Sequence, residues 1–127
     1  MTRFNITLSY AVEFVFKCLN SMKGAEIFVP KLPSYRIMDL VRSIDKNKNI
    51  KIIGVREGEK IHEELVSSVE FLSLKEKKDS YIIYPLEKNR KNIANASSYN
   101  SFNNEEFLNI KQIEKLIIQN KSDFDSI

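Results

Sequence analysis

An arginine and a glutamate, Arg56 and Glu59, stand on either side of Gly58 in a short charged stretch. The guanidinium group presents a planar fork of donors that matches phosphate oxygens, and it stays charged at neutral pH. A carboxylate can accept hydrogen bonds from a vicinal diol such as a ribose. The two residues could therefore clamp a nucleotide diphosphate. An exposed Arg–Glu ion pair, worth under about 1 kcal/mol, is the commoner meaning of this spacing.

The neighbouring residues predict how this stretch is positioned. Residues 50–55 are rich in isoleucine and valine and predict a strand, and residues 60–66 predict a short amphipathic helix. Gly54 and Gly58 predict the turn between them. Charged groups at the end of a strand are where α/β proteins tend to bind anionic ligands. The pattern therefore predicts strand, turn and helix, with Arg56 and Glu59 at the turn.

The other reactive residue types do not form a catalytic centre. His62 is the only histidine, so a metal site is not expected, and a packing role in the helix after the turn is favoured over acid–base catalysis. Tyr84 and Lys88 have the spacing of a catalytic Tyr-x-x-x-Lys pair, but Pro85 blocks the helix that the pair requires. The three glycines form neither Gly-x-Gly-x-x-Gly nor a phosphate-binding P-loop. We therefore expect this chain to bind no nucleotide cofactor.

Length and composition restrict the class of protein. With 127 residues, 43% hydrophobic and 29% charged, the chain is large enough for one ordinary globular domain. Its net charge of +3 is spread along the sequence, so nucleic-acid binding is a distant hypothesis. No apolar run approaches the roughly eighteen residues that span a membrane. The single cysteine, Cys18, predicts a buried thiol without a disulfide and a cytoplasmic location.

Helices and strands alternate along the chain, which predicts an α/β fold. Ser34 is expected to cap a helix, Gly24 to end one that is well buried, and Asn109 to open one through a capping box with Gln112. Residues 69–74 are ambiguous between helix and strand. The predicted elements are an extended segment at 2–7, a helix at 9–22, a strand at 26–29, a helix after 34, a strand at 81–84, a polar loop at 87–104 and a helix from 109.

Three blocks of sequence, with a fourth in the tail, carry a resemblance to one family. They are residues 1–4, 24–34 (Gly-Ala-Glu-Ile-Phe-Val-Pro-Lys-Leu-Pro-Ser), 52–63, and 98–104 in the tail. Together they resemble the soluble NADP-dependent UDP-N-acetylglucosamine 4,6-dehydratases of the extended short-chain dehydrogenase/reductase superfamily. The second block is most similar to the inverting type, which begins pseudaminic acid synthesis.

The resemblance implies that Arg3 and Arg56 hold the phosphates of UDP and that Glu59 binds the uridine ribose. It therefore reverses the preference for a surface ion pair. In the family, NADP takes a hydride from C4 of the sugar, water leaves across C5–C6, and the hydride returns to C6. Two residues depart from the family pattern: Ala25 replaces a glycine, and Glu57 replaces the proline of Arg-Pro-Gly-Glu-Lys.

The matching part of the family is its small C-terminal substrate-binding lobe, without the Rossmann half. The resemblance assigns residues 1–86 to the UDP-sugar lobe, 87–104 to a polar loop, 105–120 to the C-terminal helix of the same domain, and 121–127 to a tail. Met1 corresponds to an internal methionine of the family, so a truncated or split gene product, or an internal start, is expected. Such a lobe would be inactive without a Rossmann half supplied in trans. The alternative is a stand-alone, non-catalytic module that self-associates or binds a partner through the helix at 9–22.

Overall fold

Three small antiparallel sheets and three helices make up the chain, in a computed structural model that describes residues 1–47, 49–85 and 97–120. The predicted α/β class is confirmed. The helices are α1 (Leu8–Ser21), α2 (Ile37–Ile44) and α3 (Ile110–Gln119), with a 3-10 turn η1 (Glu70–Ser73). The strands are β1 (Thr2–Phe4), β2 (Ile27–Pro30), β3 (Ser34–Arg36), β4 (Glu64–Val66), β5 (Leu74–Glu76), β6 (Ser80–Ile83) and β7 (Tyr99–Asn100).

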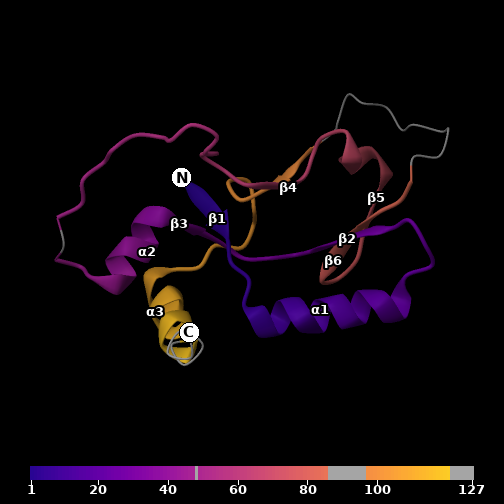
Figure 1. Cartoon of the computed structure of the whole chain (residues 1–127), viewed down its shortest axis with the longest axis horizontal. Helices are drawn as coiled ribbons and strands as arrows, with labels where there is room; N and C mark the ends of the chain where they lie inside the picture. The colour runs from indigo at the N-terminus through magenta and orange to yellow at the C-terminus, as the bar shows by residue number, and fades with distance from the viewer. Residues whose placement is uncertain (48, 86–96, 121–127) are drawn as a thin grey trace.

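The sheets join segments that are distant in sequence. β1 pairs with β3, β6 lies between β2 and β5, and β4 pairs with β7. Figure 1 shows the β2–β6–β5 sheet beside α1 at one end of an elongated molecule, and α2 and α3 packed together at the other. The β1–β3 pair lies between these two ends, so β1 is in the middle of the chain's long axis.

A small core joins the β2–β6–β5 sheet to the β4–β7 pair. It consists of Val29, Val66, Ile83 and Tyr99, with the ring of Phe4 4.9 Å from that of Tyr99. The Tyr99 hydroxyl accepts a hydrogen bond from the Leu32 amide and donates one to the Leu32 carbonyl. Burial raises the pKa of the Tyr99 phenol above its ordinary value. Tyr99 thereby ties β7 to the segment between β2 and β3.

The helices with clear local signals form where the sequence predicts them. α1 begins at Leu8, one residue before the predicted start, with Thr7 as its N-cap. α3 begins after Asn109, and the predicted capping box between Asn109 and Gln112 is present in both directions. The predicted cap at Gly24 is wrong, because α1 already ends at Ser21.

The prediction that α1 is well buried is wrong. Ala11, Phe14 and Cys18 are half-buried, and burial raises the pKa of the Cys18 thiol. A second apolar stripe is exposed on the same helix, comprising Leu8, Val12, Val15, Phe16 and Leu19. An amphipathic helix is normally covered along its apolar stripe, and no described part of this chain covers the second one.

Long-range contacts overturn two further predictions. Ser34 does not cap a helix but is fully buried in β3, where its amide donates to Glu106 and its carbonyl accepts from Leu108. The ambiguous residues 69–74 form η1 and the start of β5. Within the predicted loop 87–104, residues 99–100 form β7, while 87–96 lie outside the described residues. The division of the chain into domains stays a prediction.

Residues 50–63 contain neither the predicted strand nor the predicted helix. They run as irregular backbone from the end of α2 to β4, with a turn at 57–58. The strand needs a hydrogen-bonded neighbour, and no described residue supplies one to 50–55. The β-branched composition of residues 50–55 is therefore not enough by itself to form the predicted strand.

Candidate functional site

Arg3 on β1 is the centre of a charged junction. Its Nε lies 3.3 Å from an Oε atom of Glu63, and its Nη2 lies 3.7 Å from an Oε atom of Glu59. Its Nη1 donates to the carbonyls of Thr2 (2.7 Å) and Ile61 (3.3 Å). The side chain is only 20% exposed. Arg3 thus binds the charged loop to the first strand, and part of its donor capacity is already used within the protein.

A tight turn presents the other two predicted residues. The Glu59 amide donates to the Arg56 carbonyl at 3.0 Å, and Gly58 has a φ of 77°. A four-residue turn with this hydrogen bond and positive φ only at its third residue is of type II, which favours glycine there. The Glu59 carboxylate also accepts from the Arg56 amide at 3.1 Å. The turn therefore fixes the backbone of Arg56 and Glu59 relative to each other.

The structure brings together two of the three predicted residues by their side chains. Glu59 pairs with Arg3, more than fifty positions away in sequence, and not with the guanidinium of Arg56. Within the described chain, no ion pair involves the Arg56 guanidinium, which is exposed. Arg56 is therefore available to a ligand, while Arg3 is held in place.

A buried network that the sequence did not single out supports this junction. Thr2 Oγ1 lies 2.8 Å from His62 Nδ1 and 2.7 Å from Ser101 Oγ. The Glu63 amide donates to Ser101 Oγ, and the Ser101 amide donates to the Glu63 carbonyl. The network holds three segments together: β1, the loop that contains His62 and Glu63, and Ser101 directly after β7. Only the similarity of residues 98–104 to the family pointed toward Ser101.

His62 packs, as predicted, but not from a helix. Its ring lies 4.6 Å from that of Phe102, and its Nδ1 contacts Thr2. No cluster of histidine, cysteine or carboxylate side chains suited to a metal ion occurs in the part of the chain that the structure describes. The described helices include none that is both long and apolar enough to cross a membrane.

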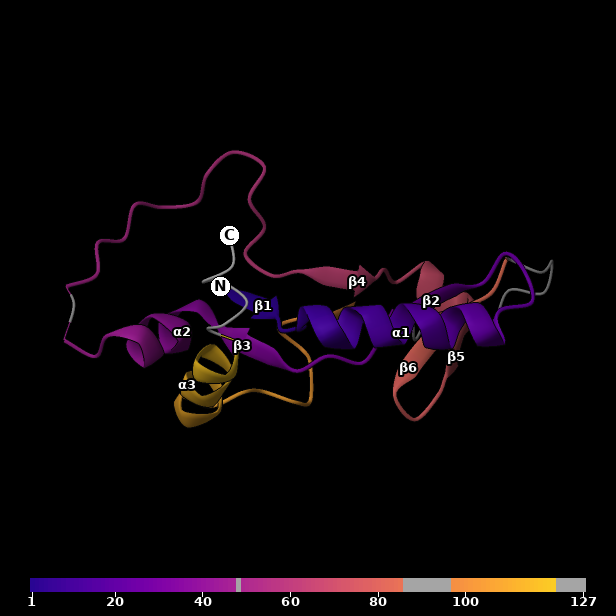
Figure 2. The same cartoon turned by 60° about the horizontal axis from the view of Figure 1, so that its bottom comes forward.

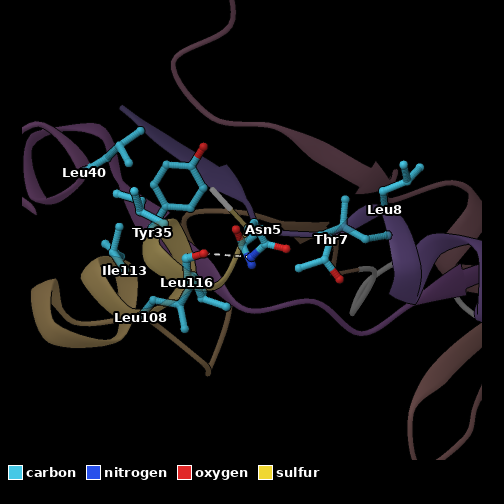
Figure 3. A pocket seen from close by; sticks show the side chains of 11 residues that line it. Asn5, Thr7, Leu8, Tyr35, Leu40, Leu108, Ile113 and Leu116 are labelled. Carbon is cyan, nitrogen blue, oxygen red and sulfur yellow. Dashed lines mark hydrogen bonds between the residues drawn. The ribbon is translucent and has the colours of Figure 1, made fainter. Parts of the chain in front are cut away.

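Figure 3 shows a separate pocket between α2, α3 and the segment before α1. Its volume is ≈ 300 Å³, and its walls are mainly aliphatic, formed by Leu40, Leu108, Ile113 and Leu116 with Tyr35 at the side. Among the described residues that line it, none carries a carboxylate, an amine or an imidazole. The pocket therefore offers space for an apolar group, and the Tyr35 phenol is the one titratable side chain among the described residues that line it.

Glu57 occupies the second position of the turn, where a proline is favoured in type II turns. Glu57→Pro is expected to raise the free energy of unfolding by about 0.4–1 kcal/mol, because it restricts the unfolded chain. If Arg56 holds the phosphates of UDP, as the resemblance implies, the change should also tighten UDP binding severalfold, because it removes a negative charge beside Arg56. Thermal melts and UDP titrations measure the two effects.

Glu57→Gln is the matched control, since it removes the same charge without restricting the backbone. It should reproduce the gain in UDP affinity and leave the stability unchanged. A Glu57→Pro chain that is less stable than the wild type would contradict the assignment of the turn.

Comparison with known proteins gives the family of this chain. A family profile described as polysaccharide biosynthesis protein matches residues 1–85. Over 87 aligned residues the chain is 44% identical to an inverting UDP-N-acetylglucosamine 4,6-dehydratase of Campylobacter jejuni. This match covers 68% of the chain and 23% of that enzyme. Over 132 aligned residues it is 34% identical to the same enzyme from another strain. That match covers 92% of the chain and 40% of the enzyme.

A solved structure agrees with these sequence matches. The chain superposes on the X-ray structure of Pen from Bacillus thuringiensis with a TM-score of 0.79 and 29% identity, over 95% of this chain and 39% of that one. The chain thus spans less than half the length of these relatives. On the match to residues 1–85, this chain belongs to the polysaccharide biosynthesis protein family.

Proposed function

We propose that this chain is the UDP-sugar-binding part of an NADP-dependent, inverting UDP-N-acetylglucosamine 4,6-dehydratase that acts in surface-glycan or pseudaminic acid biosynthesis. The family and the two dehydratases named above support the reaction class. The observation that carries the proposal is the contact between Arg3 and Glu59 beside the exposed Arg56. Arg3 and Glu59 are thus in side-chain contact although 56 positions apart, and Arg56 adjoins them through its backbone amide. The lone cysteine favours a cytoplasmic location.

The roles of the three residues follow from their chemistry. Arg56 would donate to the diphosphate through its free guanidinium, because a planar fork matches phosphate oxygens. Arg3 would add a fixed positive charge and its remaining Nη2 donor. Glu59 would accept hydrogen bonds from the ribose hydroxyls. Glu59 already pairs with Arg3. The phosphate role of Arg3 and the ribose role of Glu59 therefore depend on the same conformation of the loop.

The described residues do not fit NADP. A pyrophosphate cradle needs glycines at which the backbone approaches the ligand or another element closely. A Cβ placed on Gly24, Gly54 or Gly58 would meet no atom within 4 Å, so none of these glycines serves a close approach inside this chain. NADP would therefore be held outside the residues that the structure describes, and the given chain by itself is expected to carry out no dehydration.

Turnover tests this proposal. The purified full chain, incubated with NADP and UDP-N-acetylglucosamine, should form no 4-keto sugar. Co-expression with the part of the Campylobacter jejuni dehydratase that this chain does not span should restore a low activity, and Arg56→Ala should remove it. Turnover by the pure chain would overturn the proposal, as would an active pair that is indifferent to Arg56→Ala.

The exposed stripe of α1 supports a second candidate, a stand-alone binding module. Exposed apolar patches of this kind favour self-association or a partner. Size-exclusion chromatography with light scattering separates the two candidates. A concentration-dependent dimer that Phe16→Asp converts to monomer would favour the module, whereas a clean monomer would argue against it.

A further inference from the structure

The buried network behind Arg3 contains two hydroxyl groups whose hydrogens must find acceptors inside the protein. Ser101 Oγ accepts from the Glu63 amide at 2.9 Å and lies 2.7 Å from Thr2 Oγ1. Thr2 Oγ1 in turn lies 2.8 Å from His62 Nδ1. Ser101 is fully buried and Thr2 is 4% exposed, so bulk water does not supply a partner to either hydroxyl. The network must therefore satisfy both hydroxyl hydrogens by itself.

Counting hydrogens fixes the direction of these bonds. Each hydroxyl has one hydrogen to donate, and a backbone amide only donates. If His62 Nδ1 carries no hydrogen, Ser101 donates to Thr2 and Thr2 donates to Nδ1, so every hydrogen has an acceptor. If Nδ1 carries a hydrogen, in the neutral or the charged ring, it donates to Thr2. One of the two hydroxyl hydrogens then has no acceptor among the described residues, which is costly in a buried network.

We propose that His62 is a positioning residue of the nucleotide junction. Its ring is neutral, carries its hydrogen on Nε2, and accepts at Nδ1 the last hydrogen bond of the network. The network begins at the Glu63 amide and ends at the ring of the preceding residue, so it ties residues 62–63 to Thr2. The inference rests on the proposed function for the ligand of Arg3.

The network acts on Arg3 through the residues on either side of it. The Thr2 amide donates to the Ile61 carbonyl at 3.0 Å, and the same carbonyl accepts from Arg3 Nη1 at 3.3 Å. The Glu63 carboxylate lies 3.3 Å from Arg3 Nε. Figure 2 shows the loop after α2 returning to β1 before it enters β4. Fixing residues 61–63 to Thr2 therefore fixes the direction of the guanidinium, including the Nη2 donor proposed for the diphosphate.

Packing against Phe102 is the competing role of His62. The two rings are 4.6 Å apart, but Phe102 is 65% exposed, so the contact covers little of its side chain. A packing role requires a ring at position 62 and no particular acceptor. The positioning role requires an acceptor facing Thr2 and no ring. The two roles thus make opposite demands on a replacement.

Two substitutions of His62 separate these roles. His62→Asn loses the ring but keeps an acceptor oxygen at the same bond separation from Cβ as Nδ1. It should retain most of the affinity of the full chain for UDP-N-acetylglucosamine. His62→Phe keeps a ring against Phe102 but offers no acceptor, and it should weaken that affinity by roughly tenfold. Calorimetric titration measures both, and thermal melts check that each variant is folded.

NMR spectra of the ring nitrogens locate the hydrogen directly, because His62 is the only histidine of the untagged chain. At neutral pH, Nδ1 should resonate as a nitrogen without a hydrogen, and Nε2 as a nitrogen with one. Thr2→Ser should keep this signature. Thr2→Val removes the donor to Nδ1 and should shift the signature toward a mixture of the two tautomers.

A hydrogen on Nδ1 of the wild-type chain would overturn the positioning role. The same conclusion follows if His62→Asn binds UDP-N-acetylglucosamine no better than His62→Phe does. If the wild-type chain has its hydrogen on Nε2 and binds no UDP-N-acetylglucosamine, the result would contradict the proposed function and, with it, the ligand for which Arg3 is positioned.

Discussion

Replacing Arg3 with alanine is expected to weaken UDP binding by roughly ten- to a hundredfold, because hydrogen bonds to charged groups contribute about 1.5–3 kcal/mol each. The same change should lower the melting temperature by several degrees. The Arg3 side chain joins β1 to the carbonyl of Ile61 and to the carboxylates of Glu59 and Glu63. Its loss leaves those carboxylates without their shared cation beside a phosphate site. Calorimetric titration with UDP and thermal melts measure both effects.

Arg3→Lys and Arg42→Ala are the controls. Lysine keeps the charge but not the fork, so it should retain part of the UDP affinity and lose the bonds to the two carbonyls. Arg42 lies in the last turn of α2, and its removal should change UDP binding little. If Arg3→Ala lowers the stability and leaves the UDP affinity intact, then Arg3 is a structural anchor and not a ligand residue.

Val66→Asp is expected to unfold most of the chain at 25 °C. Val66 is fully buried in the core with Val29, Ile83 and Tyr99. An unpaired carboxylate there should cost more than about 4 kcal/mol, a large part of the 5–15 kcal/mol that stabilises a typical domain. Circular dichroism should show loss of the cooperative thermal transition.

Leu65→Asp is the matched control on the same strand. The Leu65 side chain is 39% exposed, so the same carboxylate at this position should change the free energy of unfolding by less than about 1 kcal/mol. Equal effects at the two positions would contradict the register of β4 and the place of Val66 in the core.

The sequence predicted the elements whose signals are local. α1 and α3 follow from their apolar spacing, and the capping box of α3 lies within four residues. β2 and β6 follow from short β-branched or aromatic runs, each with a proline at or near its end. In each case the information that forms the element is contained in the element itself.

The failed predictions concern residues whose structure depends on distant partners. Ser34 has the side chain of a helix cap, but contacts with β1 and with residues 106–108 make it a strand residue. Residues 50–55 have the composition of a strand, but a strand forms only against a neighbour. The apolar spacing of α1 predicted burial, but no described element of this chain covers its second stripe.

The candidate site was predictable only in part. Arg56 and Glu59 stand out by spacing, whereas Arg3 was assigned from resemblance alone, and no local pattern links it to Glu59. The Thr2–Ser101 contact joins residues 99 positions apart, so no local pattern marks it either. Ala25 has a φ of 62°, a conformation that favours glycine, and the departure from the family glycine is thus a local cost in this chain.

Titration of the purified full chain with UDP, UMP and uridine is the measurement to make first. If Arg56 and Arg3 bind the diphosphate, the affinity should fall with each phosphate removed, should fall with rising salt, and should drop about tenfold or more for UDP in Arg56→Ala. Equal binding of UDP and uridine, or UDP binding that Arg56→Ala leaves unchanged, would contradict the assignment of this junction as a nucleotide-sugar site.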